Sequence, residues 1–275
     1  MRRLVFALLS TFSLAACAQT TPPPVEGGQK ISVDSTAPAK PVAEPAFAAG
    51  SPEARVSAVL KGLNPRIRVD SIRAAPLPGF REVVASGQVV YVSDDGKYLF
   101  QGGLLDIVQK KDMSEAALAK VRNDVLKTIP LADRIVYSPV GAAKHKVVVL
   151  TDVECGYCRK FHNEMAEYTK RGIEVQYLAF PRAGLASEDY RKMVSVWCAD
   201  DRRKALTDAK NDRPVPARTC KTPVDMQHAA GLRMGLEGTP MILTTDGEFV
   251  GGYLPPDVLL QRMLQIEAER AAPKA

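Results

Sequence analysis

Residues 147–160, VVVLTDVECGYCRK, constrain most strongly what this 275-residue chain can fold into. The apolar, β-branched run 147–150 is typical of a buried strand. Cys155 and Cys158 follow in a C-x-x-C spacing, and residues 159–170 have the apolar spacing of a helix. We therefore expect Cys155 at a helix N-terminus, where unpaired backbone N–H groups favour a thiolate. Cys158 lies one turn later, so the two thiols are predicted to form a redox couple.

Other interpretations of a C-x-x-C have less support. Zinc would require a second such pair or closely spaced histidines, whereas Cys198 and Cys220 lie far apart and the three histidines are scattered. Haem attachment requires a histidine directly after the second cysteine, and Arg159 stands there. A purely structural disulfide in so short a loop would add little stability. We therefore expect no metal and no cofactor.

Residues 1–16 have the pattern of an export signal. Arg2 and Arg3 precede the apolar run 4–9, which is far shorter than the roughly 20 residues of a membrane span. Cys17 follows Leu-Ala-Ala, which resembles the lipobox of bacterial lipoproteins. An ordinary secretory signal with a stray cysteine is the alternative, but an odd cysteine in an exported chain needs an explanation. We expect a periplasmic protein that only a lipid on Cys17 anchors to a membrane.

Export places the other four cysteines in an oxidising compartment, where disulfides persist. Cys198 and Cys220 then form a second pair, whose loop closure contributes roughly 3 kcal/mol of stability. Cys198 follows Val194 and Trp197 in a helical pattern, so we expect it to be buried and inert. We interpret this pair as a structural disulfide.

Residues 17–50 are rich in Pro, Ala, Thr and Gly. They have too little apolar surface to offset the entropy of ordering, so we expect a flexible tether.

Residues 51–110 are predicted to form a small first domain. Ser51 begins a helix whose apolar face comprises Val56, Val59, Leu60 and Leu63. Five short β-rich runs follow, at 67–72, 80–85, 89–92, 98–100 and 104–108. With Asp95-Gly96 as a hairpin turn, they predict an antiparallel meander. About 60 residues give only a marginal core, which favours a second copy as partner.

Residues 111–130 are predicted to hold a linker helix, at 114–127, and residues 131–275 a second domain. Around the C-x-x-C the expected order is β-α-β, a helical insertion at 187–210, and then α-β-β-α. This order is that of a thioredoxin-like fold with an added helical subdomain. The whole chain is therefore predicted to be an α+β protein.

Several motifs in the chain resemble those of a known protein family. They are Thr151-Asp152 before the C-x-x-C, Ala179-Phe180-Pro181-Arg182, Trp197-Cys198-Ala199, Gly238-Thr239-Pro240 and, in the first domain, the run 91–97, YVSDDGK. On these motifs, residues 67–268 resemble the DsbC/DsbG family of periplasmic thiol-disulfide isomerases, most closely its DsbC branch. The resemblance implies a cystatin-like dimerisation domain before the thioredoxin-like domain, a V-shaped homodimer, and a DsbD-type membrane reductase as partner. The lipobox and tether are not part of the family's soluble members.

The resemblance also implies an activity. Cys155 would attack wrong disulfides in misoxidised or unfolded exported proteins, and Cys158 would resolve the mixed disulfide. Thr239 and Pro240 resemble the family's cis-proline loop, which leaves the Thr239 backbone free to pair with an extended substrate, and Gly156 and Tyr157 are expected to bind substrate beside it. A reductase or oxidant using the same couple, and a holdase-like chaperone that binds unfolded clients in the dimer cleft, remain alternatives.

The net charge and the remaining titratable residues add little evidence about function. The net charge of +6 becomes +4 when Arg2 and Arg3 leave with the signal, and the basic residues are spread out, so nucleic-acid binding is not supported. His162 is expected to pack or face solvent rather than act as a base. Asp152 and Glu154 are open candidates for tuning Cys155 or relaying a proton.

Overall fold

The computed structural model describes residues 44–271. The predicted export signal, Cys17 and most of the predicted tether lie outside the described residues. Within 44–271, no helix combines the length and apolar character that a membrane crossing requires.

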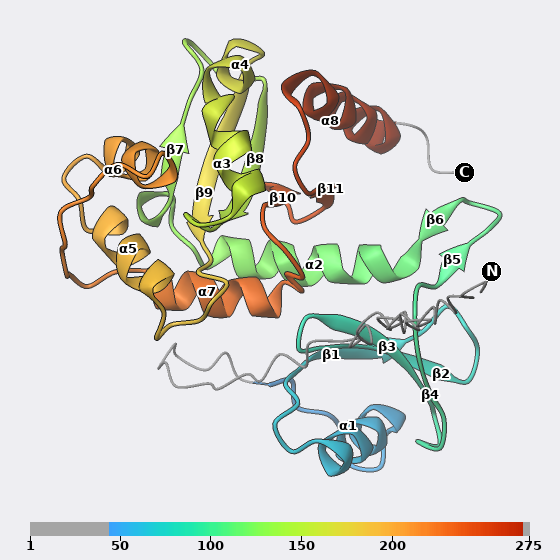
Figure 1. The fold of residues 1–275 in the computed structure, drawn as a ribbon. Helices are drawn as coiled ribbons and strands as arrows, with labels where there is room; N and C mark the ends of the chain where they lie inside the picture. The colour runs from blue at the N-terminus through green and yellow to red at the C-terminus, as the bar shows by residue number, and fades with distance from the viewer. Residues whose placement is uncertain (1–43, 272–275) are drawn as a thin grey trace, which may run out of the picture. The chain divides into compact units, whose positions relative to one another are not determined.

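The first part of the described chain is a helix followed by a four-stranded sheet (Figure 1). Helix α1 (Pro52–Leu63) begins as predicted, because the Ser51 side chain accepts a hydrogen bond from the Ala54 N–H at 3.1 Å. Strands β1 (Val69–Ala74), β2 (Phe80–Ala85), β3 (Gln88–Ser93) and β4 (Leu99–Gln101) pair in that order, all antiparallel. The predicted meander is therefore confirmed for these four strands.

The hairpin turn between β3 and β4 forms at the predicted Asp95-Gly96. The Gly96 N–H donates to the Ser93 carbonyl at 2.8 Å, and Gly96 has a φ of 76°. A glycine adopts this left-handed conformation without a Cβ clash, which explains why the turn falls at this residue.

The fifth predicted strand does not join the meander. Residues 104–108 instead contain the two-residue strand β5 (Leu105–Asp106), which pairs with β6 (Lys111–Asp112). The reason is local, because the Asp106 carboxylate accepts hydrogen bonds from the N–H groups of Val108 and Gln109 and turns the chain at once.

The packing around α1 differs from expectation at two places. Leu63, expected on the apolar face, is 72% exposed because it is the last helical residue and Asn64 already leaves the helix. The last residues of the predicted tether make contacts: Glu44 forms an ion pair with Lys61, and Phe47 packs against the cluster under α1. The folded part therefore begins before residue 51.

Helix α2 (Met113–Lys127) occupies the region predicted for the linker helix. It begins one residue early, because Asp112 rather than Ser114 caps it, accepting from the Glu115 N–H at 2.9 Å. The Ser114 hydroxyl is used elsewhere: it accepts from the Leu104 N–H at 2.8 Å and lies 2.7 Å from the Tyr91 hydroxyl.

The second sheet has the thioredoxin-like arrangement that the sequence predicted. After the short 3-10 helix η1 (Leu131–Asp133), its strands are β7 (Ile135–Tyr137), β8 (His145–Thr151), β9 (Ile173–Ala179), β10 (Met241–Thr244) and β11 (Phe249–Gly251). Their order is β11-β10-β8-β9-β7. Only β8 and β9 pair in parallel, which requires the crossover through the C-x-x-C helix.

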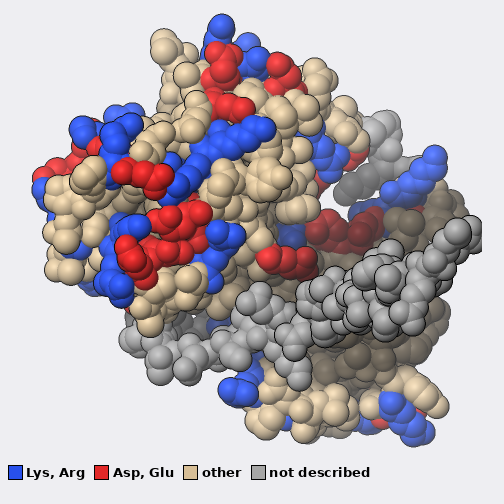
Figure 2. Space-filling model, viewed as in Figure 1, with Lys and Arg blue, Asp and Glu red and all other residues tan. Residues whose placement is uncertain are grey.

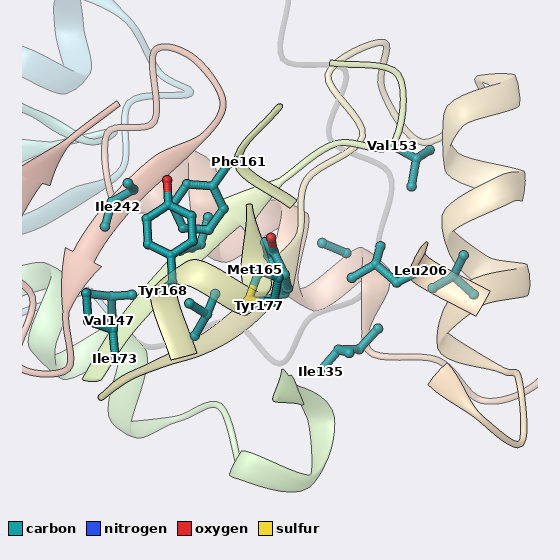
Figure 3. Close-up of a cluster of buried hydrophobic side chains, with 14 of the residues drawn as sticks. Ile135, Val147, Val153, Phe161, Met165, Tyr168, Ile173, Tyr177, Leu206 and Ile242 are labelled. Carbon is teal, nitrogen blue, oxygen red and sulfur yellow. The ribbon is translucent and has the colours of Figure 1, made fainter. Parts of the chain in front are cut away.

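Alternate residues of β8 face opposite sides of this sheet, as strand geometry requires. Val147 and Val149 pack in one buried cluster, shown in part in Figure 3, with side chains of α3 (Gly156–Asn163), α4 (Met165–Lys170) and α8 (Pro256–Ala271). Val148 and Leu150 pack in a second cluster with α2 and α7 (Val224–Arg233). Helices therefore cover both faces of the sheet, and α2 packs on the face formed by Val148 and Leu150.

Two predicted helical stretches are each broken in two. The expected helix 159–170 is interrupted at Glu164 (φ −95°, ψ 11°), which separates α3 from α4 and whose carboxylate accepts from the Tyr253 hydroxyl at 2.9 Å. The insertion comprises α5 (Glu188–Trp197) and α6 (Arg202–Lys210), because Asp201 caps a new helix with its side chain.

Candidate active site

The C-x-x-C lies where β8 ends and α3 begins. Asp152 makes the turn between them: its side chain accepts from the Glu154 N–H at 2.7 Å, and its carbonyl accepts from the Cys155 N–H at 3.4 Å. Cys155 is the N-cap of α3, and its sulfur accepts from the Cys158 N–H at 3.4 Å. Both thiols are free. Cys155 therefore faces the unpaired N–H end of a helix, as expected.

The surroundings of the two thiols shift their pKa values in opposite directions. The pKa of Cys155 is lowered to about 5, mainly by a hydrogen bond from the Cys158 thiol, with further help from the Cys158 N–H and the charge of Arg182. The pKa of Cys158 is raised, because this side chain is only 1% exposed and burial penalises its thiolate. Cys155 is thus a thiolate at neutral pH, while Cys158 keeps its proton.

The Thr239–Pro240 peptide bond is cis and faces the first thiol. The Cys155 S–H donates to the Thr239 carbonyl at 3.1 Å. In the thiol form, Cys155 therefore occupies this carbonyl. Loss of the Cys155 proton removes that hydrogen bond and leaves the carbonyl able to accept one from another chain.

Gly156 and Tyr157 lie on the open side of the pair. A Cβ on Gly156 would have no heavy atom within 4 Å, and Tyr157 is 65% exposed. The Tyr157 ring stacks on Tyr253 with 5.9 Å between centroids, and the Lys160 ammonium lies 4.6 Å from the Tyr253 ring. These residues form an exposed aromatic surface beside Cys155.

A cavity of about 940 Å³ adjoins the cis-proline loop. Its wall includes Tyr157, Thr239, Pro240 and Tyr253, together with Val89 and neighbouring residues of the first sheet and Leu118 of α2. The volume is in the range of ligand pockets, and apolar side chains make up much of the wall. It offers room for several side chains of a bound polypeptide next to Thr239.

Asp152 and Glu154 each hold a cation near the pair. Asp152 is fully buried and accepts from both the backbone N–H and the side chain of Arg182, at 2.9 and 3.1 Å. Glu154 binds Arg159 at 2.8 Å and Lys192 at 2.7 Å. Of these groups, Arg182 acts on Cys155, since its charge lowers the pKa of that thiol. Asp152 positions this guanidinium.

His162 packs, in agreement with expectation. It is 4% exposed, and its ring nitrogens lie 3.2 Å from the Tyr177 hydroxyl and 2.9 Å from the Thr207 hydroxyl. Burial lowers its pKa to about 3, so it is neutral near pH 7.

Cys198 and Cys220 are joined in a disulfide, with their Cα atoms 5.7 Å apart. Cys198 was expected to be buried, but it is only half-buried, because it lies at the C-terminal cap of α5 rather than inside the helix. Cys220 is exposed. The bond ties the end of α5 to the Pro-rich loop that follows α6.

Sequence reasoning missed one residue near the pair. Lys210, the last residue of α6, is 2% exposed, and its ammonium donates to the Thr151 hydroxyl at 2.8 Å and to the Asp152 carbonyl at 3.2 Å. No local pattern distinguishes it from the exposed Lys204 of the same helix. No three His, Cys, Asp or Glu side chains within 44–271 are grouped as a metal site would require.

On the face drawn in Figure 2, basic and acidic side chains are interspersed rather than gathered in a patch of one sign. The thioredoxin-like sheet, a low-pKa thiol at a helix N-terminus and a buried second thiol together define a thiol–disulfide oxidoreductase.

Comparison with known proteins specifies the family. Residues 47–115 match the disulfide bond isomerase protein N-terminal domain, and residues 140–267 match the thioredoxin-like domain. The chain is 35% identical over 206 residues to the thiol:disulfide interchange protein DsbC of Dickeya dadantii (strain 3937), which covers 74% of this chain and 83% of that protein. It therefore belongs to the DsbC family of thiol:disulfide interchange proteins.

Two further relatives are similar. DsbC of Haemophilus influenzae (strain ATCC 51907 / DSM 11121 / KW20 / Rd) is 37% identical over 193 residues, covering 70% of this chain and 82% of that protein. The crystal structure of a disulfide interchange protein from Neisseria gonorrhoeae is 29% identical with a TM-score of 0.44, and covers 53% of this chain and 100% of that chain.

Proposed function

We propose that this protein is a periplasmic thiol-disulfide isomerase that reshuffles wrong disulfides in misoxidised or unfolded exported proteins. The observation that carries the proposal is the contrast in pKa within the C-x-x-C: the pKa of Cys155, beside the cis-proline loop, is lowered, and the pKa of Cys158 is raised. Such a pair has an attacking and a resolving member.

The chemistry follows from these two states. The Cys155 thiolate attacks one sulfur of a substrate disulfide, forming a mixed disulfide and releasing the other substrate sulfur as a thiolate. If a substrate thiolate then attacks the mixed disulfide, Cys155 is regenerated and no electrons are transferred overall. If Cys158 attacks Cys155 instead, the substrate leaves reduced by two electrons and the pair is oxidised. Thr239, Pro240, Gly156 and Tyr157 hold the substrate during these steps.

Isomerisation requires a reduced pair, so each resolving event must be reversed. We therefore propose a DsbD-type membrane reductase as the partner that returns two electrons to Cys155 and Cys158.

The first domain, residues 51–110, serves as a dimerisation domain in this proposal, joined by the linker region 111–130 to the catalytic domain 131–275. Its support is a group of exposed apolar side chains from β4 to β6, with exposed fractions of 43% to 89%: Tyr98, Leu99, Leu105, Ile107 and Val108. An edge strand and loop of this composition favour pairing with a second copy.

We also propose that Cys17 is lipid-modified and anchors the protein to a membrane. Each buried acyl CH₂ contributes about 0.8 kcal/mol to membrane binding. Cys17→Ser should leave the protein soluble or uncleaved. Unchanged fractionation and intact mass in this variant would argue against the anchor.

The test of function compares two reactions of the same preparation. An isomerase should reactivate a scrambled multi-disulfide protein without net reduction, and should also reduce insulin when a thiol reductant is supplied. Cys155→Ala should lose both activities. Insulin reduction without reactivation would favour a simple reductase, and substrate protection that survives Cys155→Ala would favour a holdase.

A further inference from the structure

Lys210 is a buried cation without a carboxylate partner among the described residues. Its amine contacts the Thr151 hydroxyl and the Asp152 carbonyl, and lies 5.6 Å from the centroid of the Tyr177 ring. A buried ammonium that lacks a counter-ion is costly, and a methionine would fill similar space at lower cost. A buried amine at such a position points to a role in chemistry rather than in stability.

The amine is held close to the resolving thiol. Thr151 ends β8, and its hydroxyl is near enough to Cys158 that a hydrogen bond to the thiolate would lower the pKa of this thiol. The charge of Lys210 has the same effect on Cys158. The Lys210 amine, the Thr151 hydroxyl and the Cys158 thiol thus lie one after another. The first-attacking thiol, Cys155, instead faces Thr239.

The helical insertion fixes the position of this amine. Lys210 is the C-terminal residue of α6, where the helix dipole favours a cation. One turn earlier, the Thr207 hydroxyl lies 2.9 Å from His162 of α3, which ties α6 to the C-x-x-C helix. The Cys198–Cys220 bond encloses α6 in a covalent loop.

The groups around Lys210 set its proton affinity. Burial is the largest influence and lowers its pKa to about 8. Cys158, Cys155 and Asp152 favour the ammonium, whereas Arg159 opposes it. Two further neighbours, His162 and Tyr177, are neutral at pH 7, since burial lowers the pKa of His162 and raises that of Tyr177. An amine of this affinity gives up and regains a proton near neutral pH, as a general base must.

We propose that Lys210 is a positioning residue for the resolving step, which accepts the proton of Cys158 through the Thr151 hydroxyl as Cys158 attacks the mixed disulfide. This inference rests on the roles proposed above for Cys155 and Cys158.

The step balances as follows. The Cys158 S–H proton passes to the Thr151 oxygen while the Thr151 hydroxyl proton passes to the neutral amine of Lys210, giving an ammonium. The Cys158 sulfur bonds to the Cys155 sulfur, and the bond between Cys155 and the substrate sulfur breaks. The substrate leaves as a thiolate with the electron pair, and the ammonium later returns its proton to solvent or to that thiolate.

The test follows both thiols with one probe, an aromatic disulfide that releases thionitrobenzoate. Reduced protein should release the dye in a fast phase as Cys155 is captured and in a second phase as Cys158 displaces it. Because thionitrobenzoate leaves without needing a proton, the second phase reports deprotonation and attack by Cys158. Cys158→Ala should abolish this phase only.

Lys210→Met should leave the first phase unchanged and slow the second by about a hundredfold at pH 7. Its pH profile should also shift upward, because the base with a pKa near 8 is gone. Thr151→Val should have the same two effects with Lys210 in place, so the proposal stays testable if one variant does not fold. Lys204→Met is the matched control: this lysine lies on the same helix with its side chain 74% exposed, and both phases should be unchanged.

A second phase of unchanged rate in Lys210→Met would overturn this inference alone, as would a slower phase with an unaltered pH profile, which marks a structural role. Lys210→Arg separates charge from proton transfer, since a guanidinium stays charged and does not deprotonate. A fast second phase in this variant would show that charge suffices and overturn the proton route. Absence of a second phase in the wild-type protein would overturn the roles of Cys155 and Cys158 themselves.

Discussion

Arg182 donates two hydrogen bonds to the fully buried carboxylate of Asp152, at 2.9 Å from its backbone and 3.1 Å from its side chain. Because the Asp152 backbone also forms the turn before Cys155, one residue both shapes the entry to α3 and holds a cation near the thiolate. The positive charge of Arg182 lowers the pKa of Cys155, and Asp152 acts on this thiol by holding that cation in place.

The first prediction concerns this cation. Arg182→Met should raise the pKa of Cys155 above its value of about 5, because a positive charge that favours the thiolate is removed. The rate of Cys155 alkylation, measured from pH 3 to pH 9, reports the thiolate fraction. In the wild-type protein it should fall as the pH drops through about 5. Arg191→Met, an exposed arginine on α5, is the control. Identical profiles for all three proteins would contradict the argument.

The second prediction separates the two thiols. Cys158→Ala should accumulate mixed disulfides with exported proteins, because Cys155 still captures them and nothing resolves the complex. Cys155→Ala should accumulate none, since the pKa of the remaining thiol is raised and it stays protonated. Non-reducing gels of trapped complexes make the comparison. Equal trapping by both variants would show that the roles are assigned wrongly.

The sequence predicted the framework of the site because the framework depends on local patterns. The strand ending at Thr151, the helix after Cys155 and the turn at Gly96 follow from periodicity, capping and glycine conformation. The features it missed depend on long-range packing. Lys210 is buried where its amine meets Thr151 of β8, which lies 59 residues earlier in the chain. The helix break at Glu164 has its hydroxyl partner in Tyr253, 89 residues later.

The third prediction is a pH dependence of stability. His162 has a pKa of about 3 in the folded protein, against 6.5 for a histidine in an unfolded chain. Between these values the unfolded chain binds a proton that the folded chain excludes, so stability falls as the pH drops from 6.5 toward 3, at up to about 1.4 kcal/mol per pH unit. Urea unfolding at several pH values measures this slope. His162→Gln should flatten it, and an unchanged slope would assign it to other groups.

The fourth prediction concerns the Cys198–Cys220 bond, which we propose to be structural. The double variant Cys198→Ala, Cys220→Ala should lose roughly 3 kcal/mol of unfolding free energy, the chain entropy of a loop that spans 22 positions. The alkylation rate of Cys155 in the folded variant should stay unchanged, because its neighbours Thr239 and Arg182 lie outside this loop. A loss of Cys155 reactivity at full stability would give the bond a role in the site instead.

The last prediction tests whether the first domain makes the protein an isomerase. Isomerisation needs a substrate held through repeated attacks, whereas reduction needs one encounter, and a cleft between two catalytic domains would provide the holding. Removal of the first domain should therefore give a monomer that still reduces insulin but loses most rescue of a scrambled protein.

The position of the truncation is decided by α2. A protein starting at residue 131 would lack Val121 and Val125, which are buried against the same cluster as Leu150, and would expose one face of the catalytic sheet. A start at Asp112 keeps this helix and its cap. Sedimentation measures the oligomeric state. Charged substitutions at Leu105 and Ile107, which are 57% and 79% exposed, should also give a monomer while keeping the full chain. A monomer from either route with full isomerase activity would show that the dimer is not what holds the substrate.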